Sequence, residues 1–447
     1  MLSSTKAALV TVVALTLCAC TEKDPTGPMH RPKADSAARH DFVVVQLPHP
    51  WDFTDISAGA FHTCASRFDG ALYCWGWNQT GQVGTGESDP FGPFQSPICS
   101  GFFCVIAPTY VMGSVSEVEA GSNHTCAITW ATPPVGGGNA ECWGLGSSGE
   151  LGNGTSNLPV PEWVTGGISF RHISAGERSA CGTSALGMHC WGRIQGSTAT
   201  PTLISSSNAY YQIAVGADYG CAVWVSSVKY VDCWGANYEG QTGQDPSAVL
   251  SPQPIMTAPL GSAVVDVAVS SGFTCADQQS GVVNCFGANN WGQLGYGLVP
   301  SPGSPDYTYQ VKAVNEGTFC FTSLFGGVRC KTPPAQLHGV SVGWTHGCGL
   351  DPNGYAYCWG LNDNGQLGID SNANWSYAVP VVGGHTFRAI AVGLQHTCAI
   401  GTDNILYCWG DNSVGQLGNY GTSGQIWHPT PTAALRAHTP PPPRNNA

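Results

Sequence analysis

Charged residues are scarce in this 447-residue chain: Asp, Glu, Lys and Arg together make up 10%, and the formal net charge is −12. With only 16 Lys and Arg residues, the chain has no global basic field to attract a phosphate backbone, so we expect no nucleic acid partner. Long solvated helices would need more Glu and Lys. The 59 Gly and 31 Pro residues instead fit short strands joined by turns, which predicts an all-β protein.

Sequence signatures of catalysis and of bound cofactors are also missing. The chain contains no Walker A, GxSxG or HExxH sequence. The GxGxxG match at residues 144–149 lies in a turn between expected strands, without the βαβ setting of a dinucleotide site. Acidic residues are scattered, and the CxxC or Cys/His knuckles of zinc sites are absent. We therefore predict no cofactor, no metal and no enzymatic activity; an enzyme acting on surface glycan is the alternative.

The apolar stretch near the N-terminus, residues 7–17, is too short to span a bilayer comfortably. Lys6 precedes it, and the following tetrad Leu17-Cys18-Ala19-Cys20 resembles the lipobox of bacterial lipoproteins. This predicts a signal peptide over residues 1–19, a lipidated Cys20 that anchors the protein to a membrane, and a flexible tether over 20–41. We expect an exported lipoprotein of the outer membrane or cell surface. Ordinary cleavage, which would give a soluble periplasmic or secreted form, is the alternative.

One phrase recurs eight times along the chain. Its clearest copy is Gly393-Leu394-Gln395-His396-Thr397-Cys398, followed by Cys408-Trp409-Gly410 and by Gly415-Gln416-Leu417-Gly418. The period is near fifty residues, which for strand-forming sequences indicates propeller blades. The third copy lacks the Gly-Gln-Leu-Gly turn, and the sixth is degenerate. The eight predicted hairpins lie near residues 58–84, 120–152, 175–192, 215–243, 269–295, 314–331, 342–368 and 392–418.

Each copy predicts a hairpin that is closed by a disulfide. In the last copy, residues 396–400 and 405–409 pair as antiparallel strands, which places Cys398 opposite Cys408 at a separation that suits a disulfide. An even cysteine count in an exported chain favours disulfides over metal. The predicted pairs are Cys64–Cys74, Cys99–Cys104, Cys126–Cys142, Cys181–Cys190, Cys221–Cys233, Cys275–Cys285, Cys320–Cys330, Cys348–Cys358 and Cys398–Cys408.

The ordered blocks His-Thr-x-Ala, Trp-Gly-x-Asn and Gly-Gln-Leu-Gly resemble the repeat of the regulator of chromosome condensation family. The resemblance implies a β-propeller of about four-stranded blades, usually seven, over residues 42–436, and a disordered Pro-rich tail follows over 437–447. We count eight repeats and expect eight blades; seven remain possible if the sixth copy joins a neighbour. Strands at residues 42–45 and 430–435 are candidates for closing the ring within one shared blade.

Two sets of repeated side chains have more than one interpretation. The first set is His62, His124, His346 and His396. A metal site or proton relay is one interpretation, and hydrogen bonding to the backbone of the neighbouring blade is the one we favour. The second set is Trp75, Trp143, Trp191, Trp234, Trp359 and Trp409. The resemblance allows photoreception through these tryptophans, but packing beside a disulfide is the interpretation we favour.

Aromatic residues gather where the repeat is interrupted. The candidate binding residues are Phe91, Phe94, Phe102, Phe103, Tyr307 and Tyr309. Rigid aromatics of this kind suit docking, although they could equally fold back over a blade. We predict a non-catalytic, envelope-anchored monomer that binds a protein or a surface polysaccharide through rim loops. The resemblance also allows guanine-nucleotide exchange on a nuclear GTPase, a protein that an exported chain does not meet.

Overall fold

The structure is a computed structural model that describes residues 52–86, 103–130, 137–194, 196, 198–225, 229–247, 253–258, 260, 263–297, 307–314, 319–322, 328–331, 336–419 and 427–433. The chain divides into two units, Met1–Leu47 and Pro48–Ala447, and every described residue belongs to the second. The predicted signal peptide, the lipidated Cys20, the tether and the 437–447 tail therefore lie outside the described residues. None of the described elements is a helix, so none is a helix that could span a membrane.

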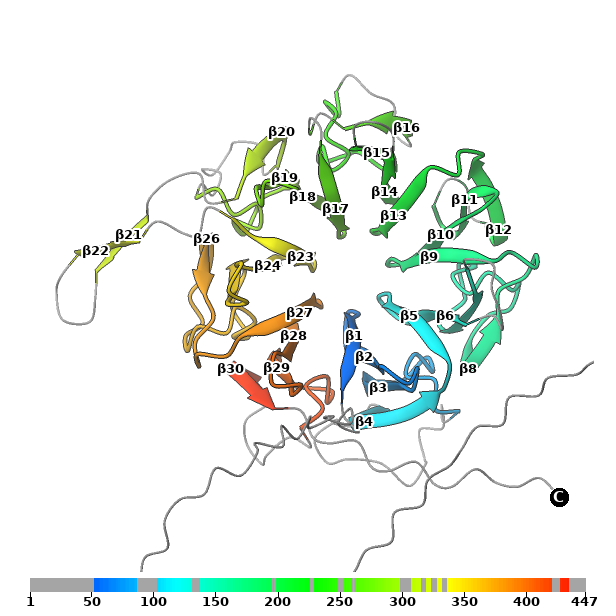
Figure 1. Ribbon diagram of the computed structural model, residues 1–447, viewed down its shortest axis with the longest axis horizontal. Helices are drawn as coiled ribbons and strands as arrows, with labels where there is room; N and C mark the ends of the chain where they lie inside the picture. Colours follow the sequence, from blue (N-terminus) through cyan, green and yellow to red (C-terminus); the bar gives the residue numbers. More distant parts are fainter. Residues whose placement is uncertain are drawn as a thin grey trace, which may run out of the picture. The chain divides into compact units, whose positions relative to one another are not determined.

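Seven four-stranded antiparallel sheets form the blades of a ring (Figure 1). Blades 1 to 4 contain β1 (Phe53–Ala58), β2 (His62–Arg67), β3 (Leu72–Trp77), β4 (Cys104–Met112); β5 (Val115–Ala120), β6 (His124–Thr129), β7 (Asn139–Gly144), β8 (Leu158–Trp163); β9 (Phe170–Ala175), β10 (Ser179–Ser184), β11 (Gly187–Gly192), β12 (Thr198–Ser205); β13 (Tyr210–Val215), β14 (Tyr219–Val225), β15 (Lys229–Gly235) and β16 (Gln253–Thr257). Blades 5 to 7 contain β17 (Val264–Val269), β18 (Phe273–Gln278), β19 (Val283–Ala288), β20 (Tyr307–Ala313); β23 (His338–Val342), β24 (His346–Leu350), β25 (Ala356–Gly360), β26 (Trp375–Pro380); β27 (Phe387–Val392), β28 (His396–Gly401), β29 (Leu406–Asp411) and β30 (Trp427–Ala433).

The expectation of eight blades is wrong, and the seven-blade alternative is confirmed. The described part of the sixth sequence copy consists of β21 (Phe319–Thr322) and β22 (Val328–Lys331), which form a two-stranded sheet of their own that Figure 1 draws outside the ring. Only 28 residues separate Cys320 from Cys348. That stretch is too short for four strands and their turns, because strands average five or six residues.

Among the described residues, no blade shares strands from both ends of the chain. Each described four-stranded sheet consists of four consecutive strands, and β30, which includes Thr430, pairs with β29 inside blade 7. The other predicted closing strand, residues 42–45, lies outside the described residues. Side chains join blade 7 to blade 1 instead: Trp75 Nε1 donates to the Gln416 carbonyl at 2.9 Å, and Arg388 donates to the Phe53 carbonyl.

The hairpin disulfides are confirmed in all seven blades. Within each blade, the two cysteines lie directly opposite across the second and third strands, with Cα atoms 4.0 to 4.1 Å apart. Cys320 and Cys330 are also opposite each other in β21–β22. Cys104 is disulfide-bonded, but its predicted partner Cys99 lies outside the described residues.

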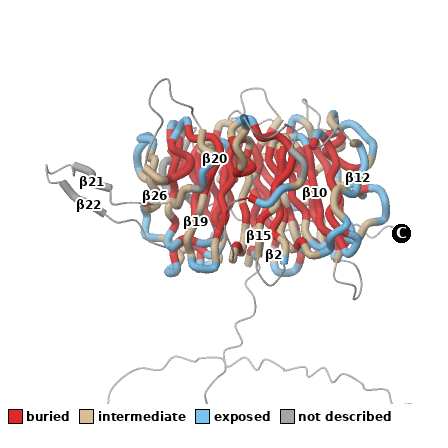
Figure 2. Tube along the Cα trace, turned by 90° about the horizontal axis from the view of Figure 1, so that it is seen from above, coloured by how far each residue is buried: buried red, intermediate tan, exposed pale blue. Residues whose placement is uncertain are grey.

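The two ends of each blade define two faces of the ring. We call the strands of a blade A to D from the channel outward. Because neighbouring strands are antiparallel, A–B turns and C–D loops emerge together on face 1, and B–C hairpins and D–A connections emerge together on face 2. Figure 2 shows the buried strands between exposed turns at the two faces.

Candidate functional site around the central channel

Strand A of every blade lines the central channel and is followed by a small residue. In six of the seven blades this residue is a glycine in close contact with the next blade. A Cβ added to Gly59 would lie 2.2 Å from the Gly121 carbonyl oxygen, and one added to Gly343 would lie 1.9 Å from that of Gly393. No other residue fits so close an approach of two backbones. The repeat glycines therefore bring the blades together and narrow the channel near face 1.

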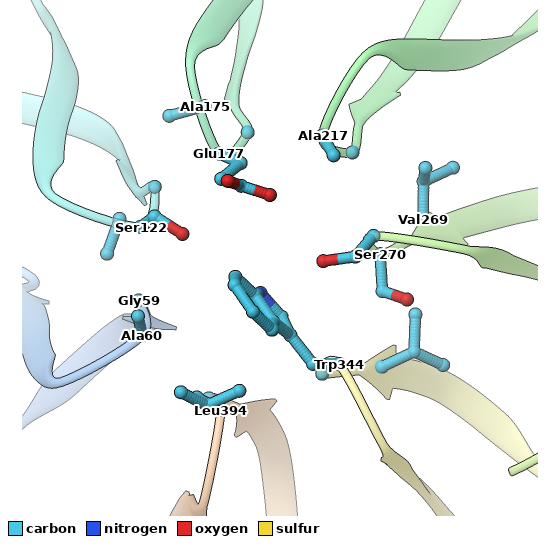
Figure 3. Close-up of a pocket in the computed structure, with 18 of the residues that line it drawn as sticks. Gly59, Ala60, Ser122, Ala175, Glu177, Ala217, Val269, Ser270, Trp344 and Leu394 are labelled. Atoms are coloured by element: carbon cyan, nitrogen blue, oxygen red, sulfur yellow. The ribbon is translucent and has the colours of Figure 1, made fainter. Parts of the chain in front are cut away.

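The channel mouth at face 1 holds a cavity of about 80 Å³. The residues that follow the small residue in each blade surround it: Ala60, Ser122, Glu177, Ala217, Ser271, Trp344 and Leu394. Figure 3 shows the Trp344 ring reaching into the centre of this mouth, with the Glu177 carboxylate on the other side. The mouth is too small for a typical organic ligand, yet the Trp344 residue is 39% exposed. Trp344 is thus available to a partner that covers face 1.

Two further exposed aromatics lie on face 1 in the two blades that precede the Trp344 blade. Tyr238, in the C–D turn of blade 4, is 71% exposed, and Trp291, in the C–D turn of blade 5, is 45% exposed. Blades 4, 5 and 6 therefore each present one aromatic side chain on the same face. We call these three residues the aromatic arc. We missed this arc in the sequence, although a signal for it is present. The turns of blades 4 and 5 carry aromatic residues at positions where the turn of blade 7 carries Ser413 and Val414.

Of the four phenylalanines in the predicted binding loop, one lies among the described residues. Phe103 is partly buried, and its carbonyl accepts the Asn78 backbone N–H at 2.8 Å on face 1. Phe91, Phe94 and Phe102 lie outside the described residues. Tyr307 and Tyr309 belong to β20, the outer strand of blade 5, and Tyr307 is partly buried. The structure thus places these two tyrosines in a strand, where ladder bonds to β19 hold the backbone.

Repeated histidines link neighbouring blades. His62 Nε2 lies 2.8 Å from Thr125 Oγ1, and the Thr125 hydroxyl donates to the Gln82 carbonyl. Since that hydroxyl proton is committed, the Nε2–H of His62 must donate to Thr125. The links from His346 to Thr397 and from His396 to Thr63 have the same form. The predicted contact with the next blade is confirmed, but its acceptor is a threonine hydroxyl, because the backbone carbonyl behind it is already bonded to that hydroxyl.

Repeated tryptophans form a second link between blades. Five of them donate Nε1–H to a carbonyl in the C–D turn of the preceding blade: Trp75 to Gln416, Trp143 to Gln82, Trp191 to Glu150, Trp359 to Gln293 and Trp409 to Gln366, at 2.7 to 2.9 Å. Trp234 Nε1 is buried and has no partner among the described residues. The C–D segment of blade 3 lacks the Gly-Gln-Leu-Gly sequence. Ile194 packs against Trp234 instead. All six tryptophans are fully buried, as the packing interpretation predicts.

Toward face 2 the channel widens to a cavity of about 380 Å³. Its lining includes the carboxylates of Asp55, Glu119 and Asp266. Burial raises the pKa of Asp55 to about 6, and backbone N–H groups of Val118 and Ile56 oppose the increase. Burial also raises the pKa of Asp266. The wide part of the channel is therefore acidic.

Comparison with known proteins identifies the repeat. Family models of the regulator of chromosome condensation (RCC1) repeat match residues 53–82, 338–366 and 387–416 in one form and 69–128 and 353–400 in another. The chain is 27% identical to the ultraviolet-B receptor UVR8 of Arabidopsis thaliana over 343 residues, which cover 73% of this chain and 69% of UVR8. It is 25% identical to the E3 ubiquitin-protein ligase HERC2 of Homo sapiens over 321 residues, but these cover only 6% of HERC2.

Solved structures show the same fold at low identity. Prp20p of Saccharomyces cerevisiae superposes with a TM-score of 0.64 at 16% identity, over 83% of this chain and 87% of Prp20p. Its structure is reported together with its binding to Gsp1p and histones. Human WBSCR16 superposes with a TM-score of 0.62 at 16% identity, over 82% of this chain and 94% of WBSCR16.

Proposed function

Because this chain is a seven-bladed propeller that carries RCC1 repeats, we propose that it is a non-catalytic binding protein that docks a protein partner on face 1. The aromatic arc of Tyr238, Trp291 and Trp344 is the observation that carries the proposal. Trp and Tyr are the residues that most often dominate binding energy at protein interfaces. Exposure of three of them on one face of adjacent blades is what a docking surface requires.

The turns that carry the arc are held in place before any partner arrives. The Trp291 backbone N–H donates to the Gln293 side chain at 2.9 Å, and Leu294 N–H donates to the Asn289 side chain at 3.1 Å. In the turn next to Tyr238, the Glu239 N–H donates to the Gln241 side chain at 2.8 Å. A partner therefore meets ordered turns, and little backbone entropy is lost on docking.

The relatives support protein binding without naming the partner of this chain. Prp20p is described with Gsp1p and histones as its binding partners. The guanine-nucleotide exchange that the family resemblance allows stays disfavoured for an exported protein. The number of disulfides fits an oxidising compartment. We place the protein in the bacterial envelope, as a monomer tethered through lipid on Cys20.

A capture experiment tests the docking surface. The purified, disulfide-intact chain is used to capture partners from native envelope extract, and each partner found is then expressed and its Kd measured. Trp291→Ala/Trp344→Ala should weaken binding at least about 100-fold, because hot-spot truncations each cost about 2 kcal/mol or more. Trp130→Ala removes a 63% exposed tryptophan on face 2 and is the matched control. Equal Kd values for the arc variant and the control would refute the proposal.

The lipid anchor has its own test. Cys20→Ser should move the protein from the membrane fraction to the soluble fraction, since the acyl chains supply the anchoring free energy. Fractionation of cells that express each form measures the change, with Cys18→Ser as the control that keeps the lipidation site. A Cys20→Ser protein that remains in the membrane fraction would contradict lipidation at this position.

A further inference from the structure

We propose that the wide acidic cavity of the channel is a binding site for a primary ammonium group on an unbranched chain, with Glu119 as its counter-ion. The cavity of about 380 Å³ lies in the size range of small-ligand sites. The cavity lies in the channel toward face 2 and is lined by no residue of the aromatic arc. The proposal is therefore independent of docking on face 1.

Glu119 differs from the acidic residues around it in having no partner. Asp55 accepts the N–H groups of Ile56 at 2.9 Å and Val118 at 3.2 Å. Glu117 accepts the Ile173 N–H at 3.0 Å and pairs with His172 at 3.2 Å. In the part of the chain that the structure describes, no hydrogen bond or ion pair reaches the Glu119 carboxylate, although this residue is only partly exposed and lines the cavity. A partly buried carboxylate without a partner is costly.

Neighbouring charges make this position more attractive to a cation. The charges of Glu117, Asp55 and Asp266 add to burial in raising the pKa of Glu119 well above its usual range. Arg388 lines the same cavity, but its guanidinium already donates to the Phe53 and Gly401 carbonyls and to the Asn404 side chain. A cation next to Glu119 would favour the ionised form of this carboxyl group and would offset the neighbouring negative charges.

The donor geometry favours an ammonium group over a metal ion. Among the described residues, no group of three His, Cys, Asp or Glu side chains could hold a metal. At the strand A position of Glu119, three other blades carry Ser57, Ser174 and Ser341, whose hydroxyl oxygens each accept one backbone N–H and keep a second lone pair. An ammonium has three N–H donors. It can pair with Glu119 and share its remaining protons with the hydroxyl oxygens of Ser57 and Ser174, which belong to the two neighbouring blades.

The other blades shape the space for an apolar chain. At the same position they carry Ala214, Ala268 and Ala391, all of which line the cavity. Small apolar side chains leave a narrow passage that accepts methylene groups. The ammonium can come from a free aliphatic diamine or from the lysine side chain of another protein, and the chemistry that recognises it is the same.

Calorimetry on the purified, disulfide-intact chain tests the site with two probes. One is 1,5-diaminopentane, and the other is a capped peptide with a single lysine. Saturable binding of the diamine alone assigns the site to a free amine, and binding of the peptide assigns it to a lysine side chain. If neither probe binds, or if the fully acetylated diamine binds as well as the free one, the proposal is overturned.

Two variants that lose the same charge locate the site. Glu119→Gln should weaken binding of the probe at least tenfold, whereas Glu162→Gln, at an exposed position of β8, should leave the Kd within twofold. The Glu119→Gln protein should melt no lower than the unmodified chain, because the substitution removes a carboxyl group that has no hydrogen-bond or ion-pair partner. Its fold is thus preserved for the comparison. Equal loss of affinity in both variants would show attraction to net charge only and would overturn the site.

Discussion

At the scale of single residues, the histidine position of one blade and the position after it in the next blade act as a pair. The seven pairs are His62/Thr125, His124/Ala180, Ser179/Gly220, Tyr219/Thr274, Phe273/Gly347, His346/Thr397 and His396/Thr63. Where the first residue of a pair is His or Tyr and the second is Thr, the two side chains share a hydrogen bond. Opposite Ala180, both ring nitrogens of His124 are buried, and neither has a partner in the part of the chain that the structure describes.

This pairing predicts opposite outcomes for two identical substitutions. His124→Phe should leave the free energy of unfolding at neutral pH unchanged or raise it, because it removes two unpartnered polar atoms. His62→Phe should lower it by about 1–3 kcal/mol, because Thr125 loses its donor. Denaturant unfolding of the oxidised proteins measures both values. The pairing would be wrong if His124→Phe cost as much as His62→Phe.

The shared phase of the histidines could be predicted from the sequence, whereas their partners could not. His62 and Thr125 are 63 positions apart, and His396 bonds to Thr63 across the closure of the ring. Neither contact follows from local spacing, because each depends on how far one blade is offset from the next. The unpartnered Glu119 was hidden for the same reason, since its surroundings come from strands of several blades.

At the scale of elements, the C–D turn of one blade binds the tryptophan of the next blade. Its carbonyl accepts the tryptophan N–H, and its apolar residue packs against the ring, as Val83 does with Trp143. Blade 5 carries Phe286 in place of the tryptophan, which shows that the ring position tolerates a side chain without the N–H.

Removal of the N–H alone should therefore distinguish the blades. Trp143→Phe should lower the free energy of unfolding by about 1 kcal/mol more than Trp234→Phe, because only Trp143 has a partner to lose. Each variant also leaves a small cavity of the same kind, so the difference between them isolates the hydrogen bond. Thermal unfolding at one pH compares the two variants, and equal destabilisation would argue against a stabilising hydrogen bond between the turn and the tryptophan.

Sequence reasoning at this scale succeeded for hairpins and failed for their assembly. The cysteine spacing predicted the register of β28 and β29 correctly, because a hairpin is set by its own turn. The blade count required knowing that the sixth copy would form β21–β22 alone. A degenerate repeat keeps its cysteines while it loses its strands, so counting motifs overestimates the number of blades.

At the scale of the whole molecule, four buried histidines should control stability in mild acid. Burial lowers the pKa of His62, His346 and His396 to about 3 and that of His124 to about 4, from 6.5. The unfolded chain binds these protons below pH 6.5 and the folded chain does not. Falling pH therefore favours unfolding, by about 2 kcal/mol per histidine at pH 5.

Carboxyl groups with a raised pKa oppose this effect, and they are Asp55, Glu119, Glu141, Asp266 and Asp277. Burial raises the pKa of Asp55 and Asp277 from 3.8 to about 6, so the folded chain binds their protons more tightly and gains about 1.4 kcal/mol for each at pH 5. We expect stability to be highest near neutral pH and to fall between pH 6.5 and 5. Denaturant unfolding across this range measures it, and a stability that rises toward pH 5 would contradict the prediction.

The seven blades have a consequence for how such proteins change over generations. Each blade is made from one continuous stretch of chain, and the ring closes through side chains between β1–β4 and β27–β30. An in-frame duplication or deletion of one gene segment can therefore add or remove a whole blade without redistributing strands among its neighbours. The hairpin β21–β22 keeps the paired cysteines of a blade and forms a two-stranded sheet. It has the form expected of a blade that was partly gained or partly lost in this way.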